Sequence, residues 1–158
     1  RLSRCPVARS RFAAVLGLAL LQPAPGFAES TDSTPPGTVS IRVEVAGFGA
    51  GGEVGCGLYR QAAGFPTDPA AALRTLWQPA RGDRVTCEFK DLPAGSYAVT
   101  ASHDTNGNRI VDTNLFGMPK EAWGVSGGVR PRLRAPRFDE ARIETPASGE
   151  LRLEVRVQ

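Results

Sequence analysis

The stretch Val39-Ser-Ile-Arg-Val-Glu-Val45 alternates apolar and polar residues without interruption. Its aliphatic residues all occupy odd positions, whereas Ser40, Arg42 and Glu44 occupy the even ones. Successive side chains of a β-strand point to opposite faces of its sheet, so a period of two predicts a strand with one face in the core. This pattern favours an all-β fold.

The same alternation returns along the chain. Leu73 to Gln78 is a further candidate strand, preceded by one helical turn that begins at Pro69. The apolar positions of the other candidate strands are Val54, Cys56 and Leu58; Val85, Cys87 and Phe89; Tyr97, Val99 and Ala101; and Leu151, Leu153, Val155 and Val157. Turn residues separate these strands, and no window of about 11 residues has helical spacing. We predict an antiparallel β-sandwich of about seven strands, immunoglobulin-like or transthyretin-like, formed by residues 39–158 as a single domain.

Residues 1–28 have the composition of a signal peptide. Four arginines precede an apolar run from Phe12 to Leu21, and Gly26-Phe-Ala28 supplies the small residues of a cleavage site. The run is shorter than the roughly 20 residues that cross a bilayer, so we do not expect it to be a membrane span. We expect no membrane span in the mature chain either. The alternative is a buried helix of a cytosolic protein. Residues 29–38 are polar and Pro-rich, and we expect a flexible tail there.

Removal of the leader changes the charge of the chain. Residues 1–28 hold four of the 19 Lys and Arg residues and none of the 16 Asp and Glu residues. The mature chain therefore has 15 basic and 16 acidic residues, a formal net charge of −1. This balance argues against nucleic acid as a partner. We expect a periplasmic or secreted protein.

The cysteines follow the same division. Cys5 lies in the leader, which leaves Cys56 and Cys87 on the core-facing parity of their strands. In an oxidising compartment an even pair favours a disulfide, and two buried free thiols are the alternative. We predict a Cys56–Cys87 bridge.

The segment that follows His103 carries a dense group of oxygen-bearing side chains. Asp104, Asn106, Asn108 and Asp112 match positions 1, 3, 5 and 9 of a calcium loop, and Ile110 would contribute its backbone carbonyl. No Glu stands at the twelfth position, so a bound Ca²⁺ would be held weakly and would brace the loop. The alternative is a hairpin turn in which Asn and Gly adopt left-handed conformations.

His103 is the only histidine, and we do not predict an enzyme. Adjacent strand residues point to opposite faces, so Ser102, His103 and Asp104 cannot converge into a triad. One histidine also cannot build a His-rich zinc site. A pair of catalytic carboxylates stays open, because the distances between acidic side chains cannot be read from a sequence.

Two further features have both a functional and a structural interpretation. Trp77 and Trp123 form either a sugar-stacking platform or anchors of the core and loops. A group of arginines lies between prolines. It forms either an anion-binding patch, for an acidic polysaccharide, a phosphorylated glycolipid or an acidic partner, or simply a solvated loop. These arginines are Arg130, Arg132, Arg134 and Arg137.

Three segments together resemble a known family. They are Ala62-Ala-Gly-Phe-Pro66, Phe89-Lys-Asp-Leu-Pro-Ala-Gly-Ser-Tyr97, and His103-Asp-Thr-Asn-Gly-Asn108 with the following Asp112-Thr-Asn114 and Gly117-Met-Pro-Lys-Glu121. The chain is similar, over about residues 39–158, to the bacterial exported family named domain of unknown function 2141. The resemblance implies an exported β-sandwich. The family usually has Gly where this chain has Arg109.

The second of these segments also resembles transthyretin-like and carboxypeptidase-regulatory-like β-sandwiches. The expected function is that of an exported non-enzymatic β-sandwich, a binding or structural module of the envelope with a calcium-braced loop. Its partner would be a polysaccharide or another envelope component. The alternative is a carbohydrate-active enzyme or its carbohydrate-binding accessory module.

Overall fold

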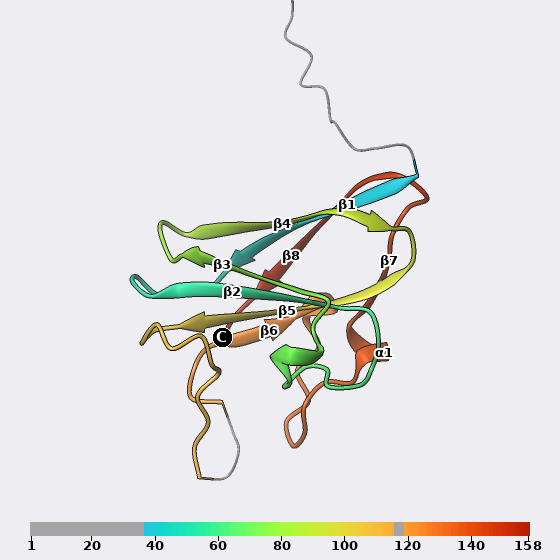
Figure 1. Ribbon diagram of the computed structural model, residues 1–158. Coiled ribbons are helices and arrows are strands. Elements are labelled where there is room, and N and C mark those ends of the chain that lie inside the picture. Colours follow the sequence, from blue (N-terminus) through green and yellow to red (C-terminus); the bar gives the residue numbers. More distant parts are fainter. Residues whose placement is uncertain (1–36, 116–118) are drawn as a thin grey trace, which may run out of the picture. The chain divides into compact units, whose positions relative to one another are not determined.

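The computed structural model describes residues 37–115 and 119–158, so the predicted signal peptide and most of the predicted tail lie outside the described residues. Eight strands form two sheets, which confirms the predicted all-β sandwich (Figure 1). None of the helices in the described ranges has the length and apolar character needed to cross a membrane.

One sheet has three strands in the order β4–β1–β8. Strand β1 spans Thr38–Ala46, β4 spans Arg84–Pro93 and β8 spans Gly149–Arg156. Strand β1 pairs antiparallel with β4 but parallel with β8. The parallel pair departs from the purely antiparallel sandwich that we predicted, because side-chain alternation identifies a strand without giving its direction.

The other sheet has five strands, ordered β3–β2–β5–β6, with β7 pairing with the start of β5. Its strands are β2 (Glu53–Tyr59), β3 (Arg74–Pro79), β5 (Ser96–Asp104), β6 (Trp123–Val125) and β7 (Arg142–Glu144). Three short helical segments complete the described chain: η1 (Pro69–Ala71), η2 (Ser126–Gly128) and α1 (Phe138–Ala141). The predicted helical turn at Pro69 is confirmed, whereas β6 and β7 were not predicted.

The inward faces of both sheets meet in one apolar core. The aliphatic residues of Val39–Val45 are fully buried, as the alternation predicts, and they face the inward residues of β2 and β5. Tyr97 is also buried, and its hydroxyl donates a hydrogen bond to the Pro93 carbonyl at 2.6 Å. This bond fixes the turn between β4 and β5, in the manner of the tyrosine corner of β-sandwiches.

The predicted disulfide is present and joins the two sheets. Cys56 on β2 and Cys87 on β4 are both fully buried, and their Cα atoms lie 6.5 Å apart. The bridge therefore crosses the core from one sheet to the other.

The outer face of the three-stranded sheet carries charges of both signs. Arg42 bonds to Glu88 at 3.4 Å and to Glu150 at 3.0 Å. Arg84 similarly lies between Glu44 and Glu154, at 3.3 and 2.9 Å. Alternating ion pairs of this kind make a well-solvated surface.

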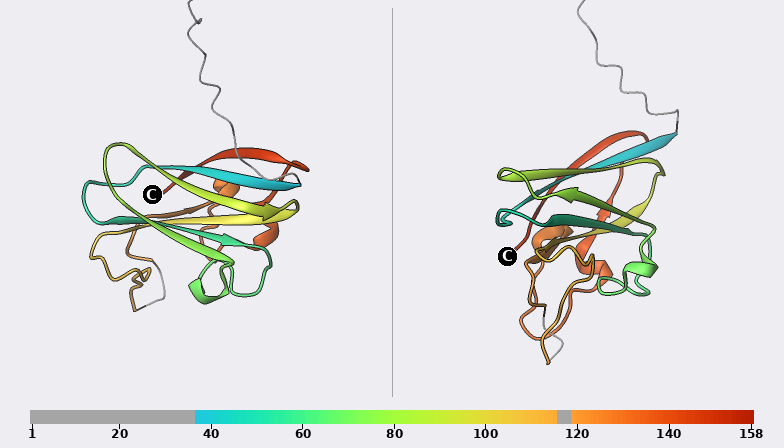
Figure 2. Two further views of the ribbon diagram at one scale, coloured as in Figure 1. Left: turned by 45° about the horizontal axis from the view of Figure 1, so that its top comes forward. Right: turned by 60° about the vertical axis from the view of Figure 1, so that its left-hand side comes forward.

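The outer face of the five-stranded sheet is different, because part of it carries a second apolar cluster. Phe65 meets Tyr59 and Phe138 edge-on, with ring centroids 5.3 and 5.8 Å apart. Buried Ala98, Val125 and Ala141 complete the cluster. It holds residues 60–72 and α1 against the sheet. Residues 105–115 and 129–137 also extend from this side, away from β1 and β8 (Figures 1 and 2).

The disulfide gives the first prediction. The double variant Cys56→Ala/Cys87→Ala should lose roughly 3–4 kcal/mol of unfolding free energy, because the bridge closes a loop of 31 residues in the unfolded chain. Urea denaturation of both proteins measures the difference. Reduction of the wild-type protein during unfolding should bring its midpoint to that of the variant, and equal stability of oxidised wild type and variant would contradict the prediction.

Candidate functional site

A groove of about 430 Å³ lies on the outer face of the five-stranded sheet. Its floor consists of small and hydroxyl side chains on the parity opposite to the core. These residues are Gly55, Gly57, Thr75, Thr100 and Ser102. Ligand sites in proteins commonly have volumes of about 300–1,000 Å³, so the groove has the size of a small-molecule site.

The strand register places the two tryptophans at opposite ends of one row across the floor. Gly55 pairs with Trp77 on one side and with Ser102 on the other. Ser102 in turn pairs with Trp123. Trp77, Gly55, Ser102 and Trp123 therefore cross four neighbouring strands in order. Both indoles line the groove, with a glycine and a serine between them.

Gly55 is required by the position of the Trp77 ring. A Cβ atom added at Gly55 would lie 2.6 Å from Cζ3, 2.7 Å from Cη2 and 3.0 Å from Cε3 of Trp77. The six-membered ring therefore rests on the backbone of Gly55. At Gly57, an added Cβ would lie 2.6 Å from the Thr100 hydroxyl oxygen, so this hydroxyl occupies the space above the second glycine.

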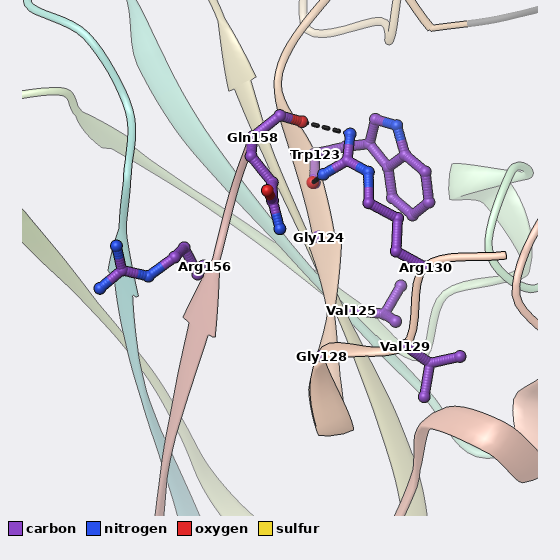
Figure 3. A pocket seen from close by; sticks show the side chains of 8 residues that line it. All are labelled: Trp123, Gly124, Val125, Gly128, Val129, Arg130, Arg156 and Gln158. Atoms are coloured by element: carbon purple, nitrogen blue, oxygen red, sulfur yellow. Dashed lines mark hydrogen bonds between the residues drawn. The ribbon is translucent and has the colours of Figure 1, made fainter. Parts of the chain in front are cut away.

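Trp123 is held in place by Arg130 and Gln158. It also lines a small hollow of about 50 Å³, where the Arg130 guanidinium lies 4.7 Å from the centre of its ring (Figure 3). Arg130 donates hydrogen bonds to the backbone carbonyls of Trp123 and Gln158. Trp123 and Gln158 also bond to each other through their backbones, at 3.3 and 3.5 Å. These contacts fix the indole that lines the groove.

Two segments far apart in the sequence form the walls. One wall is the Asp104 loop, here residues 104–115, which contributes Arg109, Ile110 and Val111. The other is the segment 131–136, which contributes Leu133 and Arg134. Ile110 is 62% exposed and Leu133 is 97% exposed, so both walls present apolar side chains to solvent. Tyr59, Pro66 and Thr67 line the groove beside the second apolar cluster.

Asp104 organises the first wall. Its Oδ1 accepts hydrogen bonds from the backbone N–H groups of Asn106 (3.1 Å) and Gly107 (2.7 Å), and its Oδ2 accepts one from Arg109 (2.5 Å). Burial opposes ionisation of this carboxyl, which is 1% exposed. The backbone donors together outweigh burial and hold the pKa of Asp104 below its usual value of 3.8.

The other predicted calcium ligands converge on Asp112. The Asn106 amide donates to Asp112 Oδ2 at 2.6 Å, and the Asn108 amide donates to both Asp112 oxygens at 3.3 Å. The side-chain oxygen of Asn106 accepts a hydrogen bond from the backbone N–H of Asn108, and that of Asn108 accepts one from the backbone N–H of Ile110. The loop is thus closed by its own hydrogen bonds, as in the hairpin-turn alternative. In the described ranges no three His, Cys, Asp or Glu side chains gather at a common point. Asn side chains are not among these groups, and calcium binding stays a prediction.

Glu121 has a role in the loop that the sequence did not reveal. Its carboxylate accepts hydrogen bonds from the backbone N–H groups of Thr105 (3.0 Å) and Asp112 (3.3 Å). It is 8% exposed. Glu121 therefore joins the two ends of the Asp104 loop, which explains why a glutamate follows the loop at this distance.

Arg109 connects the loop to the sheet. Its φ angle of 58° lies in the left-handed region, which glycine adopts most readily. The guanidinium bonds to Glu53 at 2.9 and 3.1 Å and lies 5.7 Å from the centre of the Trp77 ring. The side chain therefore ties the wall to the floor of the groove.

His103 lies on the opposite face of β5 from Ser102. Its Nε2 donates to the Gly51 carbonyl at 2.8 Å, and its ring lies 5.8 Å from that of Phe48. Ser102 instead lines the groove. The two side chains are thus divided between core and groove, as the strand alternation requires.

The arginines of residues 130–137 are spread over different partners. Arg130 stacks on Trp123, and Arg134 bonds to Glu140 at 2.8 and 2.5 Å. This hydrogen-bonded pair, helped by the Arg137 backbone N–H, lowers the pKa of Glu140 to about 2. Arg132 and Arg137 are exposed. Two of the four arginines are therefore engaged within the chain, and the anion patch stays a prediction.

The chemistry of the lining limits what the groove can do. None of its described lining residues is an Asp, Glu, His or Cys. Apart from Tyr59, the ionisable side chains there are Arg109 and Arg134, each paired with a glutamate that does not line the groove. General acid–base catalysis normally uses the missing residue types, and a hydroxyl nucleophile such as Ser102 normally needs one of them as its base. Stacking and hydrogen bonding are the chemistry that these residues provide.

Asp104 gives the second prediction. Asp104→Ala should destabilise the protein by about 2 kcal/mol, because it leaves backbone donors of a half-buried loop without acceptors. The pKa of Asp104 is lower in the folded protein than in the unfolded chain. Its ionised carboxylate therefore stabilises the fold fully at a pH above the unfolded-state pKa, and this contribution is lost as the pH falls through the folded-state pKa. The stability difference should therefore be constant at neutral pH and shrink below about pH 4. Urea unfolding from pH 7 to pH 2 measures it, and a difference that persists unchanged to pH 2 would contradict the mechanism.

A comparison with protein families assigns the chain. Residues 43–152 match a family described as "Uncharacterized protein conserved in bacteria (DUF2141)". Neither the curated proteins nor the solved structures contain a match to the chain. The family match covers well over half of the sequence and includes both the groove floor and the Asp104 loop, and the protein therefore belongs to the DUF2141 family.

Proposed function

We propose that the protein is an exported, non-enzymatic binding module of the bacterial envelope, and that it binds its ligand in the groove. The observation that carries this proposal is the row from Trp77 through Gly55 and Ser102 to Trp123. A concave apolar site with a few convergent polar groups is the usual form of a ligand site.

The contrast between the two outer faces supports this location. The three-stranded sheet presents a lattice of ion pairs such as Arg42–Glu150 and Arg84–Glu154. The five-stranded sheet instead presents indoles, glycines and hydroxyls between two walls with exposed aliphatic tips. Exposed apolar side chains that gather around one depression are typical of binding surfaces.

Export to the periplasm or the medium is part of the proposal. It is supported by the order of positive, apolar and small residues in 1–28. The Cys56–Cys87 bridge also suits an oxidising compartment, because cytosolic thiols are kept reduced. We further propose a transthyretin-like or carboxypeptidase-regulatory-like sandwich, supported by the bond between the Tyr97 hydroxyl and the Pro93 carbonyl.

The second candidate is a carbohydrate-active enzyme or its carbohydrate-binding accessory module. Trp77 and Trp123 favour the accessory module, because aromatic platforms are suited to sugar rings. Glycoside hydrolysis ordinarily uses a pair of carboxylates beside the scissile bond. The described lining of the groove supplies none, so the enzyme is the less supported form of this candidate.

A weakly bound Ca²⁺ bracing the Asp104 loop completes the proposal. The position of Asn106 and Asn108 beside Asp112 supports it, because rotation of their amide groups, which now donate to Asp112, would turn their oxygens toward that carboxylate. The Ile110 carbonyl would add a backbone ligand. Asp104 already accepts three backbone N–H groups, so only part of its oxygen capacity remains for a cation. The ion would hold a groove wall and have no catalytic part.

The groove gives the third prediction. Ser102→Phe should abolish ligand binding, because a ring at the centre of the floor fills the groove without entering the core. Thr86→Phe on the charged outer face is the matched control and should bind normally. A thermal-shift screen of polysaccharide fragments, acylated lipids and Pro-rich peptides identifies the ligand class with wild-type protein. Stabilisation that survives Ser102→Phe, or no stabilisation by any class, would contradict the proposed function.

The calcium brace gives the fourth prediction. We expect a dissociation constant of about 10⁻⁴–10⁻³ M, because two carboxylates and no bidentate Glu are present. Calcium at ten times this concentration should stabilise the folded protein by about 1.4 kcal/mol. Asp112→Asn should remove the effect while preserving the loop's shape, and magnesium at equal concentration serves as the ionic-strength control. If calorimetry detects no heat of binding and calcium leaves the thermal midpoint unchanged, the loop is a hairpin turn that binds no calcium.

A further inference from the structure

We propose that the groove binds a neutral oligosaccharide, with sugar rings stacked on Trp77 and Trp123 and ring hydroxyls bonded to the floor between them. This inference rests on the proposed function and names the ligand class of the same site.

The spacing of the two indoles requires a ligand longer than one sugar ring. Trp77 and Trp123 stand on β3 and β6, which are separated by β2 and β5. Three strand spacings of about 4.8 Å place their backbones roughly 14 Å apart, and the Trp77 ring, which rests on Gly55, lies about two spacings, roughly 10 Å, from the Trp123 backbone. A chain of two or three rings spans such a distance.

The floor and its ends match the two kinds of surface on a sugar. A pyranose ring has apolar C–H faces, which stack on the electron-rich face of an indole, and a rim of hydroxyls. Between the indoles, Thr100 and Ser102 present hydroxyl groups that both donate and accept hydrogen bonds. Because Gly55 and Gly57 have no side chains, the Trp77 ring and the Thr100 hydroxyl lie close to the sheet, so an aromatic face and a hydroxyl group lie together at the level of the floor.

The charge balance of the lining favours a neutral ligand. Arg109 and Arg134 line the groove, but Glu53 and Glu140 neutralise them from outside it. An arginine has five N–H donors, and the bonds to a glutamate use only some of them. The remaining N–H groups can donate to sugar hydroxyls without requiring a negative charge on the ligand.

Two other ligand classes fit the same observations less well. An acyl chain would cover the hydroxyls of Thr75, Thr100 and Ser102 without offering them partners, which is costly for polar groups. A peptide that adds a strand needs a free sheet edge. The central floor strands β2 and β5 are paired on both sides, and β3 and β6 end the row, so a strand added there would lie beside the groove rather than in it.

Both indoles are positioned before a ligand arrives. Trp77 rests on Gly55, and Arg130 stacks on Trp123 at 4.7 Å and bonds to its carbonyl. Rigid aromatic side chains lose little conformational entropy on binding. These two residues are also the only tryptophans in the chain, so their fluorescence can be used to monitor binding in the groove.

Intrinsic tryptophan fluorescence therefore reports on the two ends of the groove. The probes are neutral β-1,4-linked glucose, β-1,4-linked N-acetylglucosamine and α-1,4-linked glucose, each as chains of one to four rings. For one series, affinity should rise at least about tenfold from one ring to three and then level off, because the chain has reached the second indole. Calorimetry with the same probes gives an independent dissociation constant.

Variants test the contribution of each end. Trp77→Ala and Trp123→Ala should each weaken binding of the three-ring chain about tenfold, and Trp123→Phe should weaken it less because a stacking ring is kept. Arg132→Gln, outside the groove lining, is the matched control and should change nothing. Circular dichroism and thermal midpoints establish that each variant is folded. Affinity that is independent of ring number or of both tryptophans, or no binding of any neutral series, would overturn the inference.

Three further probes separate failure of this inference from failure of the proposed function. They are polygalacturonate as an anionic sugar, a Pro-rich decapeptide and a dodecyl-chain detergent below its micellar concentration. If one of these binds in place of neutral sugars and Ser102→Phe abolishes its binding, the groove is the site and the sugar inference is wrong. If its binding is indifferent to Ser102→Phe, both the inference and the proposed site are wrong.

Discussion

The register of the five-stranded sheet is the constraint on which the rest of the structure depends. Each residue of β2 and β5 that points into the core has neighbours that point to the outer face. The core position of Cys56 therefore also determines that Gly55 lies on the groove floor. The bridge from Cys56 to Cys87 holds this register against the opposite sheet. A slip of one residue would move the cysteine out of the core and turn the groove floor inward. The groove is therefore as well defined as the core beneath it.

Side-chain alternation was sufficient to predict most of the fold. It located β1, β2, β4, β5 and β8, and it placed both cysteines on core-facing positions. It could not locate β6 and β7, because three residues are too few for a period of two to be visible. It also could not give the parallel pairing of β1 with β8, since strand direction depends on long-range contacts. These missing features are tertiary, and they decide where Trp123 lies.

The two parts of the candidate site differ in how far the sequence reveals them. The Asp104 loop is local, so its oxygen side chains are visible as a spacing within one short segment. The groove joins residues from β2, β3, β5, β6 and two distant segments, and no single window contains them. Its sequence signals were the two tryptophans, Trp77 and Trp123, and the small or hydroxyl residues on the outward parity of the strands, which are Gly55, Gly57, Thr75, Thr100 and Ser102. The structure gives the reason for the glycines, because the Trp77 ring and the Thr100 hydroxyl occupy the space above them.

The loop and the groove are mechanically one unit, because Arg109 belongs to both. Its backbone N–H is bound by the Asp104 carboxylate, and its side chain bonds to Glu53 beside Trp77. Any event that orders the loop therefore also orders the guanidinium next to the indole. Coupling of this kind is reciprocal. If an ion that orders the loop raises the affinity of the groove for its ligand, the ligand raises the affinity of the loop for the ion by the same factor. Arg109 makes both contacts from a left-handed backbone conformation, which glycine would adopt with less strain.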